Sequence, residues 1–364
     1  MRTSSTPPTS PALPTEADLA AAAHRSDPLA DALADRVLAD PTGWRRFDEA
    51  LRHGADSAVD PAVRDLVLDL ERTCAAADDE VLDAAAEPTF TASMGVHVFD
   101  VGAGALISSY RPPTTSTILV RTGRLLGENA HARLLETAQW LTAASLPSGT
   151  RPGRRGFVST AHVRLGHAVV RRRVQREDPP ADGTVPISQL DQLRTWLDFT
   201  YVAPQSAAVL GIDLTPAEYA RFLRFWRHLG TLLGVEPGLT AGVVDLAGAR
   251  TLHDRIDART AAPNDDARAL TASGLTVLAT TLAELTPIPA LVATPLVEVV
   301  SRAMQGDPLA DALGIPRHPL LSRAVPVVAA VQRARRDRLR RNPTAWAAAI
   351  ARNTAANREF LDAG

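Results

Sequence analysis

The stretch that decides the fold is TAHVRLGHAVVRRRV, residues 160–174. Positions three and four apart share a helix face, and the pattern predicts a helix over about 157–176. One stripe of that helix carries His167 between Arg164 and Arg171, among valines. Burying permanent positive charges beside an imidazole is costly unless an anion covers the same face. Haem would meet both needs, because iron takes the imidazole nitrogen and the propionates take the arginines.

The same spacing has a second interpretation, in which His167 is a core histidine bonded to a backbone carbonyl and the arginines reach out to water. His162 lies five residues earlier, off the stripe, and is expected to be a structural or surface residue. No histidine stands four residues from His167, so the sequence does not predict a metal site with two histidines on one helix. His167 is therefore the candidate ligand to iron, with Arg164 and Arg171 as candidate haem-binding residues.

The preceding segment predicts a second helix, over about 128–145. Within ARLLETAQW, three- and four-residue spacing places Arg133, Glu136 and Thr137 on one face. The turn SLPSGTRPGRRG would let this helix fold back on the next one as a hairpin, so that the two faces oppose each other. These three residues are then candidate catalytic residues. The alternative is an exposed face held by salt bridges.

The composition predicts an all-α protein. Aromatic residues are only 4% of the 364 residues, while alanine and leucine dominate, which favours helices packed on helices. We expect a disordered tail over 1–20, a single helical domain over 21–345, and a C-terminal helix or tail over 346–364. The net charge of -2 argues against a general nucleic-acid-binding protein.

Residue types that are scarce exclude several chemistries. All 39 basic residues are arginine, so there is no Schiff-base or phosphate-loop lysine. Cys74 is the single cysteine, which excludes an intramolecular disulfide. The N-terminal segment has no apolar core of signal-peptide length, and the apolar stretch over 273–300 is broken by prolines. We therefore expect a cytoplasmic protein without a transmembrane segment.

Two further segments give local predictions. Thr215-Pro216 starts a helix expected to run to Gly234, with a hydroxyl cap and a proline in the first turn. The segment QRARRDRLRR, residues 332–341, carries six arginines. Without interleaved aromatics, it is expected to form a solvated helix face and not a nucleic-acid site.

Three features together resemble a known family. They are DPLADAL at 27–33, the pair Arg133 and Thr137, and Arg164-x-x-His167 followed by Arg171. In this order they resemble the DUF2236 family, which holds the actinobacterial latex-clearing proteins and the MpaB-type oxygenases, over about 27–340. The resemblance implies a globin-like helical core with added helices. It also implies haem b, with His167 as its proximal ligand and the arginines around it.

The sequence departs from that family in two ways. Latex-clearing proteins are typically exported by a twin-arginine signal, which this chain lacks, so extracellular polyisoprene is a poor candidate substrate. Their distal lysine corresponds to Glu136 here, and the resting iron is therefore expected to have an open site. Family resemblance thus supports haem more strongly than it supports rubber cleavage.

The function that follows is a haem-dependent oxygenase, or an enzyme that uses peroxide, acting on a hydrophobic small molecule such as an isoprenoid or secondary metabolite. Arg133, Glu136 and Thr137 would line its distal pocket. Two alternatives remain at this stage: a non-catalytic haem or O2-binding globin-like protein, and a haem-free helical scaffold. The sequence leaves the substrate, the electron donor and the oligomeric state open.

Overall fold

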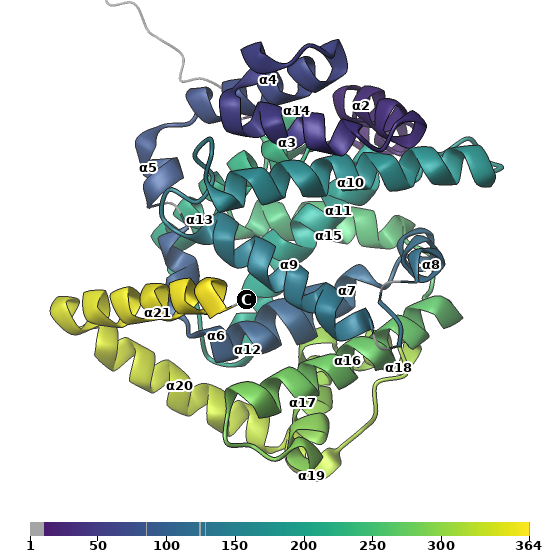
Figure 1. Cartoon of the computed structure of the whole chain (residues 1–364). Coiled ribbons are helices and arrows are strands. Elements are labelled where there is room, and N and C mark those ends of the chain that lie inside the picture. The colour runs from purple at the N-terminus through teal and green to yellow at the C-terminus, as the bar shows by residue number, and fades with distance from the viewer. Residues whose placement is uncertain (1–10, 85, 124, 128, 364) are drawn as a thin grey trace, which may run out of the picture.

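The computed structural model describes residues 11–84, 86–123, 125–127 and 129–363, and every regular element in them is a helix (Figure 1). The all-α prediction is confirmed. Successive helices pack around three large apolar clusters, as expected when each helix has one apolar face to bury.

The N-terminus is ordered earlier than predicted. The expected disordered tail over 1–20 is wrong for its last residues, because α1 (Glu16–Ala22) is a helix. Thr15 and Asp18 form a reciprocal capping box, and Leu19 is fully buried in the core. A short capped helix is stable here because its apolar side chains are buried in tertiary contacts. Residues 1–10 lie outside the described part.

The next helices build the end of the molecule drawn in purple in Figure 1. Asp27 caps α2 (Pro28–Ala39) and Asp60 caps α4 (Pro61–Ala76), each with proline in the first turn. Their apolar faces share one core with α10 (Arg155–Glu177). The other elements of this half are α3 (Gly43–His53), η1 (Ala55–Ser57), α5 (Asp79–Asp83), η2 (Glu87–Thr91) and α6 (Met94–His97).

The predicted hairpin is present. Helix α9 (Asn129–Ser145) packs on α10, and the turn between them brings the two backbones into contact. A Cβ at Gly156 would lie 2.5 Å from the carbonyl oxygens of Ala143 and Gly149, so only glycine allows this close approach. Trp140 Nε1 donates to Thr160 Oγ1 at 3.0 Å across the pair.

Two π-helical segments lie in the centre, over Val98–Leu106 (η3) and Asp198–Val202 (η4). Such segments are rare and often mark functional regions. They pack on each other, and Ser108, just after η3 in the chain, donates a 2.9 Å hydrogen bond from its Oγ to Asp198 Oδ1 in η4. Around them lie α7 (Ile107–Ser109), α8 (Pro113–Thr122), α11 (Gln189–Leu197), α12 (Ala203–Val209), α13 (Pro216–Leu232), α14 (Pro237–Thr240) and α15 (Leu246–Arg259).

The third core cluster belongs to the C-terminal half, where α16 (Asp265–Leu285) and α17 (Ala290–Gln305) pack on η3. The apolar stretch over 273–300, which prolines break, belongs to these two helices. The chain ends in α18 (Asp307–Ala312), α19 (Pro319–Ser322), α20 (Ala324–Arg340) and α21 (Pro343–Ala363).

Among the described residues, no single helix has both the length and the hydropathy needed to cross a membrane. One pair, Asp79–Thr91 with Met94–Ser109, meets that requirement only when taken together, across an 82° bend.

Candidate functional site

Helix α10 has two faces with different surroundings. Phe157, Ala161 and Leu165 are buried against the first helices of the chain. The opposite face is partly exposed, and it holds Val163, Gly166, His167, Val170 and Val174. The predicted stripe is therefore divided lengthwise, because its arginines point into the protein while His167 and its valines stand on the open side.

His167 has an unusual environment. Its Nδ1 atom is fully buried and has no hydrogen-bond partner among the described residues, whereas the side chain as a whole keeps some exposure. Burial lowers the pKa of His167 to about 4, helped by the positive charges of Arg171 and Arg133 against the opposing charge of Asp27. The imidazole is thus neutral at pH 7, which is the form that binds metals.

The three candidate catalytic residues lie together on α9. Arg133 Nη1 donates to Thr137 Oγ1 at 2.9 Å and lies 3.7 Å from Glu136 Oε2. The Thr137 hydroxyl in turn donates to the carbonyl oxygen of Arg133 at 3.1 Å. The charge of Arg133 acts on both His167 and Tyr110, so this face lies close to the α10 histidine.

Arg164 and Arg171 have partners that the sequence analysis did not assign. Arg164 donates to Asp27 at 2.6 Å and to Asp69 at 2.7 Å, and Arg171 donates to Asp31 at 2.7 Å. The anions that balance these buried arginines are therefore carboxylates of the chain itself. The expected anions beside the buried arginines are thus present, as Asp27, Asp31 and Asp69. The predicted contact of the arginines with haem propionates stays a prediction.

The two motifs of the resemblance thus meet in space. DPLADAL provides Asp27 and Asp31, and the α10 motif provides the arginines. Gly234 covers this cluster, since a Cβ there would lie 2.2 Å from Asp27 Oδ2 and 2.9 Å from Arg164 Nε. Its φ of 88° is also one that glycine readily adopts.

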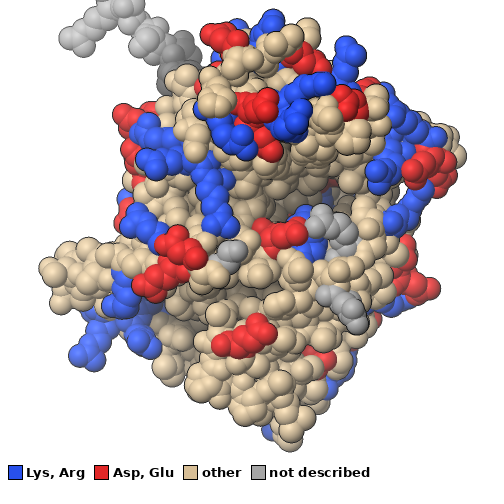
Figure 2. All heavy atoms as spheres, in the orientation of Figure 1, with Lys and Arg blue, Asp and Glu red and all other residues tan. Residues whose placement is uncertain are grey.

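The space beside His167 is open. A Cβ added at Gly166 would meet no atom within 4 Å, unlike one at Gly156 on the same helix. Figure 2 shows the molecular surface hollowed below α10, next to α8 and α9. In the described residues no group of three or more His, Cys, Asp or Glu side chains could hold a metal ion. A single neutral imidazole next to open space does suit haem, which brings four ring nitrogens of its own.

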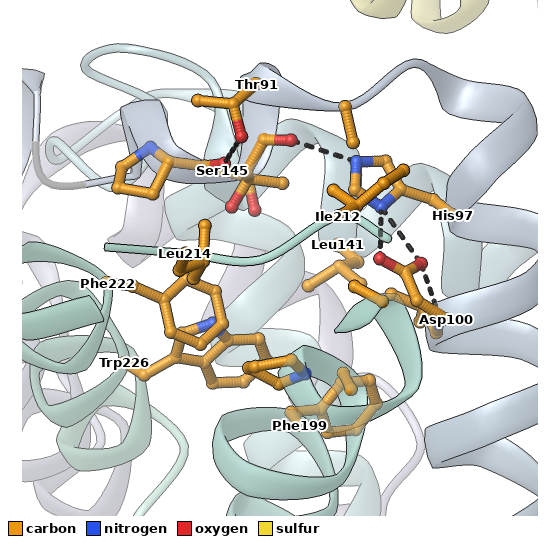
Figure 3. Close-up of a pocket in the computed structure, with 17 residues that line it drawn as sticks. Thr91, His97, Asp100, Leu141, Ser145, Phe199, Ile212, Leu214, Phe222 and Trp226 are labelled. Atoms are coloured by element: carbon orange, nitrogen blue, oxygen red, sulfur yellow. Dashed lines mark hydrogen bonds and ion pairs between the residues drawn. The ribbon is translucent and has the colours of Figure 1, made fainter. Parts of the chain in front are cut away.

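A separate cavity lies near the C-terminal end of α9. It has a volume of about 60 Å³ and is lined mostly by apolar side chains, including Leu141, Phe199, Phe222 and Trp226 (Figure 3). Leu141 follows Thr137 by one helical turn, so the face of α9 that carries Thr137 continues into this cavity. The sequence gives no sign of this cavity, because its lining residues come from segments that lie far apart in the chain.

His97 and Asp100 form an ionisable pair at the edge of this cavity. Its Nδ1 lies 3.1 Å from Asp100 Oδ1 and its Nε2 lies 3.0 Å from the carbonyl oxygen of Thr89. Burial opposes a charge on the ring, but the charge of Asp100 and these hydrogen bonds outweigh it and raise the pKa of His97. Two acceptors facing the two ring nitrogens favour the doubly protonated imidazolium.

A raised histidine pKa has a defined effect on stability. The contribution of His97 is fully present below its ordinary pKa of 6.5 and is lost as pH rises through the higher folded-state value. We expect His97→Gln to lower the free energy of unfolding more at about pH 5.5 than at about pH 9. Urea titrations of parent and variant at both pH values measure this. An equal loss of unfolding free energy at both pH values would contradict a charged His97–Asp100 pair.

Comparison with known proteins identifies the family of this chain. A family model described as "ER-bound oxygenase mpaB/B'/Rubber oxygenase, catalytic domain" matches residues 92–341. The chain belongs to this family. It is 26% identical over 321 residues to the rubber oxygenase of Streptomyces sp. strain K30, covering 83% of this chain and 72% of that protein.

A solved structure of latex clearing protein in its closed state shares the fold. It matches with a TM-score of 0.68 and 20% identity, over 93% of this chain and 90% of that one. The resemblance drawn from DPLADAL and the arginine and histidine motifs is thereby confirmed, and so is the predicted fold class. In this family member the DPLADAL aspartates hold the α10 arginines.

Proposed function

We propose that this protein is a b-type haem-dependent oxygenase that acts on a hydrophobic small molecule with O2 or peroxide. The observation that carries the proposal is His167, a neutral imidazole with an orphaned buried nitrogen, on the open face of α10. Membership of an oxygenase family supports the reaction class.

His167 is proposed to be the single protein ligand to haem iron. Bound haem would supply the iron centre at which O2 or peroxide is activated. The valines beside His167, at 163, 170 and 174, would pack on the apolar macrocycle. The packed back face of α10 would fix the place of His167 relative to the open side of the helix.

Arg164 and Arg171 are proposed to act through α10. Their ion pairs to Asp27, Asp69 and Asp31 tie the helix to α2 and α4, and so fix the place of His167. A propionate contact would have to share donors that carboxylates already occupy. We therefore expect positioning of α10 to be their larger contribution to haem retention.

The face of α9 is proposed to be the distal side. The Arg133 guanidinium is a donor held in place by its hydrogen bond to the Thr137 hydroxyl oxygen, and it could orient a polar oxygen of the bound oxidant. Glu136 has a half-exposed carboxylate on the same face and could give or take a proton there. The apolar lining of the small cavity further along α9 supports the proposal of a hydrophobic substrate, such as an isoprenoid or a secondary metabolite, without itself being large enough to hold one.

Glu136→Gln tests the proton-transfer role, since it keeps the shape of the side chain and removes its acid. Because general acid–base catalysis typically contributes 10²–10⁴-fold, we expect the turnover rate to fall by about 100-fold and its pH dependence to flatten. The control is Glu49→Gln on α3, a carboxylate of similar exposure beside Arg45. An unaltered pH–rate profile in Glu136→Gln would remove this role.

The function as a whole is tested by producing the full chain in cells supplied with a haem precursor. The purified protein should show a Soret band and should consume O2 or peroxide with polyisoprenoids or other hydrophobic substrates. A coloured protein that binds O2 reversibly without turnover would support the carrier alternative. A colourless protein that takes up no added haemin would overturn haem dependence.

A further inference from the structure

The end of the molecule that carries α17, α19 and α20 exposes many apolar side chains. Eight of the twelve large apolar side chains that are exposed among the described residues lie between 285 and 331. Leu320 is 79% exposed, Val327 62% and Val331 63%. This end is largely free of charged side chains in Figure 2, below α17. Clustered exposure of this kind marks an interaction surface.

The exposed residues of helix α20 change from apolar to basic along its length. Its outward stripe, at three- and four-residue spacing, runs from Val327 and Val331 to Arg335 and Arg338, and all four are exposed. The first turns of the stripe are thus apolar and the last turns are basic. We call this stripe, with Leu320 and Leu321 just before it, the α20 surface.

The arginines of α20 divide into two groups, which corrects the expectation that the whole segment is a solvated face. Arg336 is buried, where it donates to Thr91 and lies 4.9 Å from the ring centroid of Trp346. Arg333 and Arg340 are held by carboxylates of the fold. Arg335 and Arg338 point outward, with no ion pair or hydrogen bond in the described part of the chain.

The charge of the α20 surface favours one occupant. Asp337 is the only acidic residue of α20, and it lies off the outward stripe by helical spacing. A second copy of the chain could cover the valines but would bring no acidic group from the same stripe to Arg335 and Arg338. A lipid bilayer with anionic headgroups offers hydrocarbon and negative charge within the 17-residue length of the helix.

We propose that the α20 surface docks the protein on an anionic lipid bilayer, with α20 lying in the plane of the interface. Leu320, Val327 and Val331 enter the headgroup boundary, and Arg335 and Arg338 contact lipid phosphates. The docking is peripheral. It is a property of the folded chain and does not depend on haem or on the proposed reaction.

Sedimentation of the full chain with vesicles tests the proposal. The vesicles contain phosphatidylcholine alone or phosphatidylcholine with phosphatidylglycerol. We expect the parent to prefer the anionic vesicles, and Leu320→Asp with Val327→Asp to lower partitioning by at least about tenfold. Arg335→Gln and Arg338→Gln should each lower partitioning into the anionic vesicles by about fivefold, with little effect on neutral ones.

Matched controls use similar residues at the other end of the molecule. Val59 is 91% exposed but stands alone, and Arg52 is an exposed arginine on α3. Val59→Asp and Arg52→Gln should leave partitioning unchanged. Equal binding of parent and Leu320→Asp/Val327→Asp, or no binding of the parent, would overturn the proposal. The surface would instead be assigned to a second copy if the parent does not bind vesicles but dimerises with concentration, and if the double variant abolishes that dimerisation.

Discussion

Replacing His167 with alanine is expected to remove most of the haem from the purified protein. The Soret absorbance per protein should fall by about tenfold or more, because the imidazole is the only protein ligand proposed for the iron. The mutation deletes a ring whose Nδ1 is buried without a partner, so no hydrogen bond is lost with it. The loss should therefore appear in the absorption spectrum while the circular dichroism spectrum stays helical.

The matched control is His162→Ala, on the same helix five residues earlier. The His162 ring is bonded to Asp48 and lies against Trp44 and Phe47, away from the open face. This variant should keep its haem. Free imidazole added to His167→Ala should restore part of the Soret band by filling the vacated space. Equal haem content in His167→Ala and the parent would reject the ligand assignment.

Replacing Arg164 with leucine is expected to destabilise the whole fold. Its guanidinium and the carboxylate of Asp27 are each only 5% exposed, so the mutation leaves a buried charge with no counterion. Removal of one partner from such a pair typically costs about 3–5 kcal/mol. Arg172→Leu is the control, since Arg172 and Asp35 are each about one third exposed and their pair should contribute less than about 1 kcal/mol.

A double variant separates the two roles of Arg164. If the arginine mainly holds α10, Arg164→Leu combined with Asp27→Leu should recover part of the lost free energy of unfolding, because both buried charges are gone. Arg164→Leu should speed the transfer of haem to an acceptor protein, and in the double variant the transfer rate should return toward that of the parent. Transfer that stays fast in the recovered double variant would instead show a direct propionate contact.

The sequence predicted well what depends on local pattern. The α9–α10 hairpin, the capping of the helix at Thr215 and the grouping of Arg133, Glu136 and Thr137 all follow from spacing along one chain segment. These features depend on helix periodicity and capping chemistry, which neighbouring residues determine.

What the sequence could not supply is the identity of distant partners. Arg164 binds Asp27 and Asp69, which are far from Arg164 and from each other in the sequence. No spacing rule links these three positions. One signal was available: two aspartates four apart in DPLADAL share a helix face that an arginine could span. The second copy of that string shows one arginine doing so, since Arg302 binds both Asp307 and Asp311. In the first copy the two aspartates bind separate arginines, Asp27 with Arg164 and Asp31 with Arg171.

The glycine that covers the Asp27–Arg164 pair has a practical consequence for selection experiments. Any side chain at position 234 would press on Asp27 and Arg164, and through them on the helix that carries His167. A colony screen that picks pale variants would therefore recover changes at Gly234 alongside changes at His167. If haem binds as proposed, a mutational map based on colour alone would mark position 234 as part of the haem site, although its effect would act through Asp27 and Arg164.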